Sequence, residues 1–98
     1  MRDTIANDGV GLGQNYPNPF NSNTKIVWQS PVGGWQSIKI FDVLGNEVAA
    51  LVDEYKHSGK YEVDFHLESS NRNLVSGIYF YQLRAGDFSD IKKMILLK

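Results

Sequence analysis

Hydrophobic and polar residues alternate along much of this 98-residue chain, most cleanly over residues 60–67 (KYEVDFHL). A period of two places apolar side chains on one face of a strand and polar side chains on the other. Similar runs, separated by clusters rich in Gly, Pro, Asn and Ser, predict strands at residues 24–30, 36–42, 47–52, 60–67, 78–85 and 88–98. The pattern predicts an all-β chain, folded as a small antiparallel β-sandwich.

The segment after residue 46 fits two patterns. Its apolar side chains at positions 48, 51, 52 and 55 have helical spacing, whereas those at positions 48, 50 and 52 alternate as in a strand. The preceding DVLGN favours a hairpin turn, because Asp42 is able to bond nearby backbone amides and Gly45 to supply a positive φ. We therefore expect a strand.

The last 22 residues, GIYFYQLRAGDFSDIKKMILLK, predict two strands joined by a turn at Gly86. Alternation leaves two choices for the face toward the core: Ile78, Phe80, Met94 and Leu96, or their neighbours. Residues 94–97 carry neither charge nor proline, the usual protection of a sheet edge. An edge there would need a cover.

Two segments outside the strands are informative. Residues 1–11 are polar and glycine-rich, which indicates a linker. Gly9, Gly11 and Gly13 do not form a phosphate-binding loop, because no predicted strand precedes them, the third glycine is misplaced, and prolines prevent a helix after them. In residues 68–75, we expect the apolar pair Leu74 and Val75 to lie under the sandwich.

Residues 16–20, YPNPF, form a stiff, non-helical segment, because Pro17 and Pro19 each fix φ and restrict the residue before them. We expect Tyr16 and Phe20 to close one end of the core. The alternative is a polyproline-type ligand for another protein, but the prolines lack the P-x-x-P spacing.

Composition narrows the possible functions. Hydrophobic residues at 42% and charged residues at 21% are ordinary for a globular domain. A net charge of -1 argues against a nucleic-acid or anionic-membrane partner, and the absence of cysteine excludes disulfides and a thiol nucleophile. No apolar run reaches the roughly eighteen residues of a membrane span.

The sequence offers little for catalysis. His57 falls in a predicted loop, and His66 shares the polar face of a strand with Glu62 and Asp64. Such a stripe is more often a solvated sheet face than a metal site, and no nucleophile stands beside a base. We expect no enzyme activity, metal or cofactor.

Aromatic residues raise a second functional class. Trp28, Trp35, Tyr55 and Tyr81 would suit a carbohydrate-binding module if their rings were exposed. The alternative interpretation places Trp28 in the core and Trp35 over a loop.

Four blocks of sequence together resemble a known family. They are LGQNYPNPFN (residues 12–21), IKIFDVLGNEVAALV (38–52), SGIYFYQLRAG (76–86) and KKMILLK (92–98). The family is the type A C-terminal sorting domain of the type IX (Por) secretion system of Bacteroidetes, and the resemblance covers residues 12–98. It implies an immunoglobulin-like antiparallel β-sandwich of about seven strands.

The resemblance also implies a function. Such a domain follows a cargo protein, here absent from the chain, and directs it from the periplasm across the outer membrane. A sortase-like cysteine protease then removes the domain at the cell surface, upstream of residue 12, and the cargo is secreted or attached to a lipopolysaccharide anchor. The partners implied are this protease and the secretion machinery. An alternative resemblance is to the structural adaptor domain of flagellar hook-capping proteins.

Ten residues match the family motifs. They are Pro17, Asn18, Pro19 and Phe20 in the proline block, Asp42 and Gly45 in the turn, Gly77 and Tyr79 in the G-x-Y block, and Lys93 and Lys98 in the tail. The tail departs from the pattern, since its lysines bracket four residues where well-known members bracket three. Residues 3–5 (Asp-Thr-Ile) also resemble a bacterial O-glycosylation motif.

Overall fold

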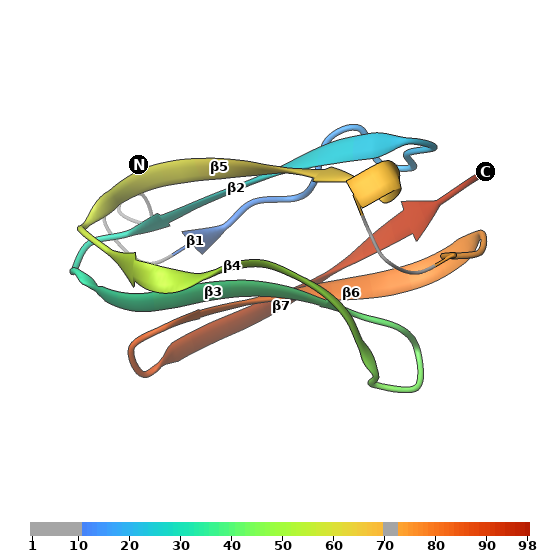
Figure 1. The fold of residues 1–98 in the computed structure, drawn as a ribbon. Helices are drawn as coiled ribbons and strands as arrows, with labels where there is room; N and C mark the ends of the chain where they lie inside the picture. Colours follow the sequence, from blue (N-terminus) through green and yellow to red (C-terminus); the bar gives the residue numbers. More distant parts are fainter. Residues whose placement is uncertain (1–10, 70–72) are drawn as a thin grey trace, which may run out of the picture.

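The computed structural model describes residues 11–69 and 73–98. In this part of the chain, seven strands form a sheet of three and a sheet of four, packed as a sandwich (Figure 1). The strands are β1 (Gly11–Leu12), β2 (Asn23–Ser30), β3 (Gly34–Phe41), β4 (Glu47–Lys56), β5 (Gly59–His66), β6 (Gly77–Ala85) and β7 (Phe88–Leu96), with a 3-10 turn, η2 (Leu67–Ser69), after β5. The all-β prediction is confirmed, and β2 to β7 lie within a few residues of the six predicted strands, whereas the two-residue β1 was not predicted.

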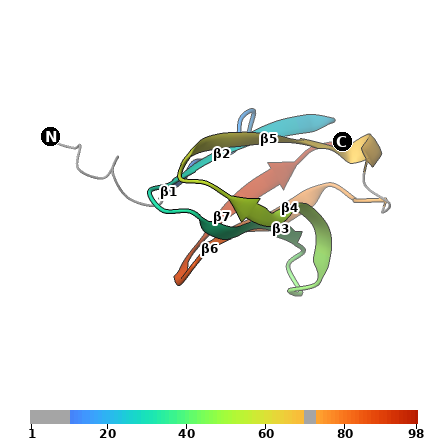
Figure 2. The same ribbon diagram turned by 60° about the vertical axis from the view of Figure 1, so that its left-hand side comes forward.

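The two sheets have the orders β1–β2–β5 and β4–β3–β6–β7, and all their pairings are antiparallel. The second view shows the two layers, with β2 and β5 above and β3, β4, β6 and β7 below (Figure 2). Because β2 and β3 lie in different sheets, as do β4 and β5, the chain crosses between the layers as in immunoglobulin-like sandwiches. The predicted immunoglobulin-like sandwich is confirmed.

Alternate side chains of the strands fill the space between the sheets. Those fully buried include Tyr81, Ile26, Ile38, Ile40, Leu83, Met94 and Leu96. In the terminal hairpin the register pairs Tyr79 with Met94, so these two share the inner face. Ile78 and Phe80 lie on the other face, and the predicted grouping of Ile78 and Phe80 with Met94 is therefore wrong.

Strand β4 runs to Lys56, beyond the predicted end at residue 52. Its pairing with β3 shifts register twice, between Ile38 and Lys39 and between Ile40 and Phe41. Each irregularity disturbs the strict alternation of faces, which explains why the apolar residues of β4 imitate helical spacing. The strand prediction is correct, and residues 53–56, predicted as loop, belong to the strand.

The prediction for the loop before β6 is half correct. Leu74 is buried under the sandwich, whereas Val75 is exposed. The predicted linker lies mostly outside the described residues, and the O-glycosylation motif at residues 3–5 lies entirely outside them. The last residue of the linker, Gly11, begins β1.

Candidate recognition site

Parts of the four sequence blocks lie toward the same end of the sandwich, with the turn between β3 and β4 standing apart below the others in Figure 1. The turn between β3 and β4, the start of β6, the end of β7 and the proline segment (residues 14–20) all reach the right-hand end in Figure 1. We call this the motif end. The opposite end carries the turns between β2 and β3, β4 and β5, and β6 and β7.

The proline segment covers the edge of β7. Asn18 Oδ1 accepts a hydrogen bond from the Ile95 amide at 2.9 Å. The Phe20 amide donates to Ile95 O at 3.0 Å, and the Leu97 amide donates to Phe20 O at 2.8 Å. Gln14 Nε2 extends the contact to Lys93 O at 2.8 Å. The apolar edge of residues 94–97 therefore has its cover, supplied from the other end of the sequence.

The two aromatic residues of the segment have different roles. Phe20 is 3% exposed and packs edge-on against Phe65, with ring centroids 6.1 Å apart. Tyr16 is 80% exposed, so its predicted place in the core is wrong. Tyr16 pairs with Lys25 in an antiparallel bridge, and residues paired in this way point to the same face. Because Lys25 is exposed, Tyr16 points outward, and its neighbour Asn15 points into the core.

A buried polar cluster anchors the start of this segment. The Tyr81 hydroxyl donates to Gly13 O at 2.6 Å and accepts from the Asn15 amide at 2.8 Å. Asn15 Nδ2 donates to Thr24 Oγ1 at 3.0 Å, and Thr24 Oγ1 donates to Pro17 O at 2.8 Å. Burial raises the pKa of Tyr81 to about 12, so the phenol stays protonated and able to donate.

Asp42 holds the turn between β3 and β4. Its Oδ1 accepts the amides of Leu44 and Asn46, both at 2.9 Å, and its main-chain oxygen accepts the Gly45 amide at 3.0 Å. The hydrogen bonds to the carboxylate lower the pKa of Asp42, and the bond from the Asn46 amide does so most. Gly45 has φ +87°, the left-handed conformation that a side chain disfavours. The mechanism proposed for this turn from the sequence is confirmed.

Tyr79 and Lys98 hold the loop before β6. The Tyr79 hydroxyl donates to Val75 O at 2.7 Å, four residues back, as in the tyrosine corner of immunoglobulin-like domains. Lys98 Nζ donates to Leu74 O, and the Lys98 amide donates to Ser76 Oγ, both at 2.9 Å. The loop is thus fixed by β6 and by the residues that follow β7.

The remaining motif residues show no comparable side-chain bond. Lys93 lies on the outer face of β7 opposite Phe80 and is exposed. Pro17 and Pro19 are exposed, and the peptide bonds before both are cis. Gly77 begins β6 with φ +153°.

The described residues hold no group of three His, Cys, Asp or Glu able to bind a metal. The acidic stripe on β5 faces Lys25, whose Nζ lies 3.0 Å from Glu62 and 4.0 Å from Asp64. This interaction, mainly with Glu62, raises the pKa of Lys25. Within residues 11–69 and 73–98, no helix is long and apolar enough to cross a membrane.

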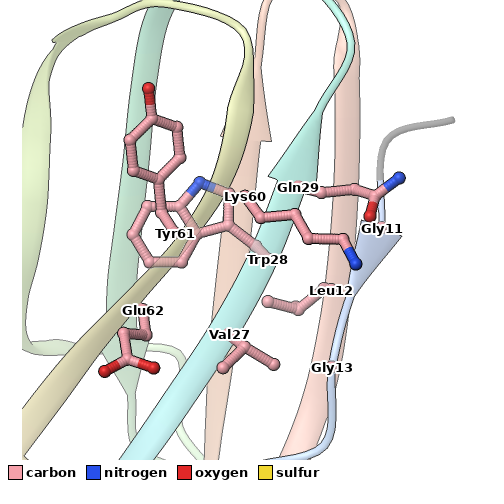
Figure 3. A pocket seen from close by; sticks show the side chains of 9 residues that line it. All are labelled: Gly11, Leu12, Gly13, Val27, Trp28, Gln29, Lys60, Tyr61 and Glu62. Atoms are coloured by element: carbon pink, nitrogen blue, oxygen red, sulfur yellow. The ribbon is translucent and has the colours of Figure 1, made fainter. Parts of the chain in front are cut away.

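A surface depression lies over β1, β2 and β5 (Figure 3). Its lining consists of Gly11, Leu12, Gly13, Val27, Trp28, Gln29, Lys60, Tyr61 and Glu62. Trp28 stacks on Tyr61 at 5.6 Å and donates through Nε1 to the buried Gln36 Oε1, so it belongs to the core. The depression therefore lacks an exposed tryptophan platform.

The other aromatic residues divide in the same way. Tyr81 is buried, whereas Trp35 and Tyr55 are exposed, cross-strand partners at the opposite end. With Trp28 and Tyr81 in the core, the four rings do not form one carbohydrate-binding surface.

Fold and site together define a small immunoglobulin-like sandwich that presents a fixed end to its surroundings. The model of the family described as secretion system C-terminal sorting domain matches residues 14–97. The chain belongs to this family. Its function is that of a type IX secretion sorting signal, which implies export across the outer membrane to the cell surface or beyond.

A solved structure agrees on the fold. The chain is similar to part of dimeric latent PorU from Porphyromonas gingivalis, with a TM-score of 0.65 and 19% sequence identity. The similarity covers 90% of this chain and 9% of that chain, so this chain spans a small part of PorU. A search of curated proteins gives no match.

Gln14, Asn15 and Thr24 belong to the site but were not predicted. For Thr24 the sequence carries a weak signal, because the alternation of β2 places it on the same buried face as Ile26. No pattern in the sequence indicated that Gln14 reaches Lys93, because that contact joins segments 79 residues apart.

Proposed function

We propose that residues 12–98 are the removable export signal of a cargo protein, without catalytic activity of their own. The signal is presented by the ten motif residues in their folded arrangement, and the secretion machinery reads it in the periplasm. At the cell surface a sortase-like cysteine protease cuts within or upstream of residues 1–11, a linker remnant. The location of parts of four distant sequence blocks toward one end of the sandwich carries this proposal.

The physical reason is that a sorting signal must look the same on unrelated cargoes. A folded surface meets this requirement if its loops are fixed independently of the cargo. At the motif end, Asp42, Tyr79 and Lys98 fix their loops through bonds within this domain. The family match over residues 14–97 fits a self-contained module.

A reporter fusion tests the proposal. The chain is joined to the C-terminus of a periplasmic reporter in a strain with an active type IX system and in one without it. We expect the reporter outside the outer membrane only in the first strain, with residues 12–98 missing from the exported product by mass spectrometry. Retention in the periplasm of both strains would contradict the export role.

The tail needs a separate variant. Deleting residues 91–98 should trap the reporter, but it also removes the buried Met94 and Leu96. Lys93→Ala leaves the core intact and tests the exposed lysine alone. Reduced export of Lys93→Ala, with an unchanged unfolding midpoint, would assign the lysine to recognition; unchanged export would remove it from the site.

A further inference from the structure

Exposed apolar side chains occupy the turn that Asp42 holds. Val43 is 66% exposed and Leu44 is 83% exposed. The central positions of such a turn accept most residue types, so the local fold does not require two apolar residues there. Solvent does not favour them either. Their exposure at this tip leaves them available for contact with a partner.

The same arrangement recurs in the loop before β6. Val75 is 70% exposed, and its main-chain oxygen accepts the Tyr79 hydroxyl. Lys98 bonds to the residues on both sides of it, Leu74 and Ser76. The loop thus presents one valine on a backbone fixed by Tyr79 of β6 and by Lys98, after the end of β7.

A third instance lies at the end of β7. Leu97 is exposed, and its amide donates to Phe20 O at 2.8 Å. In each instance a residue of the family motifs bonds the backbone, and an apolar neighbour that is not itself a motif residue projects into solvent. Asp42, Tyr79, Lys98 and Phe20 therefore act as supports.

We propose that Val43, Leu44, Val75 and Leu97 are the contact residues of the sorting signal, and that Asp42, Tyr79, Lys98 and Phe20 are positioning residues. The partner is a protein component of the export machinery with apolar recesses that receive these side chains. This inference rests on the proposed export function.

A protein fits this surface better than a lipid bilayer. The apolar side chains stand on separate loops, with the polar Asp42, Asn46 and Ser76 beside them. Discrete apolar points on fixed loops match recesses of defined shape, as interface anchors do. The net charge of -1 gives no attraction to an anionic bilayer.

Three exposed valines provide a matched test. Val43 and Val75 lie at the motif end, and Val32, which is 59% exposed, lies in the turn between β2 and β3 at the opposite end. The Val32 turn is held locally too, since Ser30 Oγ donates to Val32 O at 2.8 Å. In the reporter fusion, we expect Val43→Ser and Val75→Ser to lower export about tenfold each, and Val32→Ser to leave it unchanged.

The outcomes separate the inference from the proposed function. If the wild-type fusion is not exported, the export function itself fails. If it is exported and all three serine variants match it, the function stands and the contact surface is wrong. Equal loss in all three variants would also overturn the assignment to the motif end.

Positioning and contact are distinguished by rescue. Asp42→Ala should lower export as Leu44→Ser does, whereas Asp42→Asn retains an Oδ1 acceptor and should restore it. Loss of export in both Asp42 variants would contradict a positioning role. The purified chain is also tested for self-association and for binding to phosphatidylglycerol vesicles. Self-association that Leu44→Ser abolishes would assign the surface to a second copy, and vesicle binding that it abolishes would assign the surface to a membrane. Either result would overturn the inference.

Discussion

The motif end and the opposite end of the sandwich differ in how far their hydrogen bonds reach along the sequence. At the motif end, Asn18 bonds Ile95, 77 residues away, and Lys98 bonds Leu74, 24 residues away. At the opposite end, the Tyr61 hydroxyl bonds His57 O, four residues back, and Ser30 bonds Val32 O, two residues on. A longer-range side-chain bond there joins Trp35 Nε1 to Asp53 Oδ1, 18 residues away, across the neighbouring strands β3 and β4.

This difference determines whether the loops at each end form one surface of fixed shape. A local bond fixes one turn, whereas a bond between distant segments fixes the relative positions of several loops. Because the motif end joins the proline segment, the loop before β6 and the end of β7, it presents one composite surface. At the opposite end, the side-chain bonds of Tyr61, Ser30 and Trp35 lie within one turn or between neighbouring strands.

The largest expected effect comes from removing the aromatic anchor of the motif end. Phe20→Ala should lower the free energy of unfolding by about 3–5 kcal/mol, since the ring is buried against Phe65. Tyr16→Ala, in the same segment but exposed, should cost less than about 0.5 kcal/mol. Urea denaturation measures both; equal losses would show that the segment is not anchored through Phe20.

Removal of a single hydroxyl comes next. Tyr81→Phe leaves Gly13 O and the buried Asn15 amide without their partner, which should cost about 1–3 kcal/mol. Tyr55→Phe, at an exposed ring, is the matched control. A Tyr81→Phe chain as stable as Tyr55→Phe would mean that residues 13–15 are held by something else.

Tyr81 should also make the free energy of unfolding depend on pH. The folded-state pKa of Tyr81, raised to about 12, exceeds its ordinary value of 10.0 because burial disfavours the phenolate. The folded state then binds more protons than the unfolded state between these values, so this contribution is complete below pH 10 and is lost as pH rises toward 12. The stability difference between wild type and Tyr81→Phe should shrink over that range; a constant difference would contradict this.

A glycine pair isolates backbone strain at the turn. A Cβ at Gly45 or at Gly11 would have no heavy atom within 4 Å, but only Gly45 has positive φ. Gly45→Ala should therefore cost about 1–2 kcal/mol in thermal or urea unfolding, and Gly11→Ala close to nothing. Similar costs at both sites would show that the turn relaxes.

The smallest expected effect separates stability from recognition. Val43→Ser, Val75→Ser and Val32→Ser should each change the free energy of unfolding by less than about 0.5 kcal/mol, since all three side chains are exposed. Differential scanning calorimetry of the three variants checks this. A larger loss in Val43→Ser or Val75→Ser would make stability an alternative cause of any export defect.

The fold could be predicted because period-two alternation and turn residues are local signals. The turn at Asp42 and Gly45 was predictable for the same reason, since both partners lie within five residues. Strand β4 was ambiguous because two register shifts disturb its faces. The faces of the terminal hairpin depended on its register, which alternation does not determine.

The site was less predictable. Motif residues were recognisable by resemblance, but their partners were not, because Asn18 and Ile95 meet only through the tertiary fold. Tyr16 was placed wrongly in the core because aromatic character predicts burial, whereas the backbone pairing with Lys25 decides which way the side chain points. The contact residues proposed above could be identified only from the exposed fractions of their side chains in the structure.

The central structural claim is that the proline segment closes the edge of β7. Amide hydrogen exchange, resolved by residue, tests it directly. We predict slow exchange at the amides of Ile95 and Leu97, which donate to Asn18 Oδ1 and Phe20 O. We predict fast exchange at the amide of Ser89, which points to the same edge of β7 but lies beyond the proline segment. Exchange at Ile95 and Leu97 as fast as at Ser89 would contradict the claim.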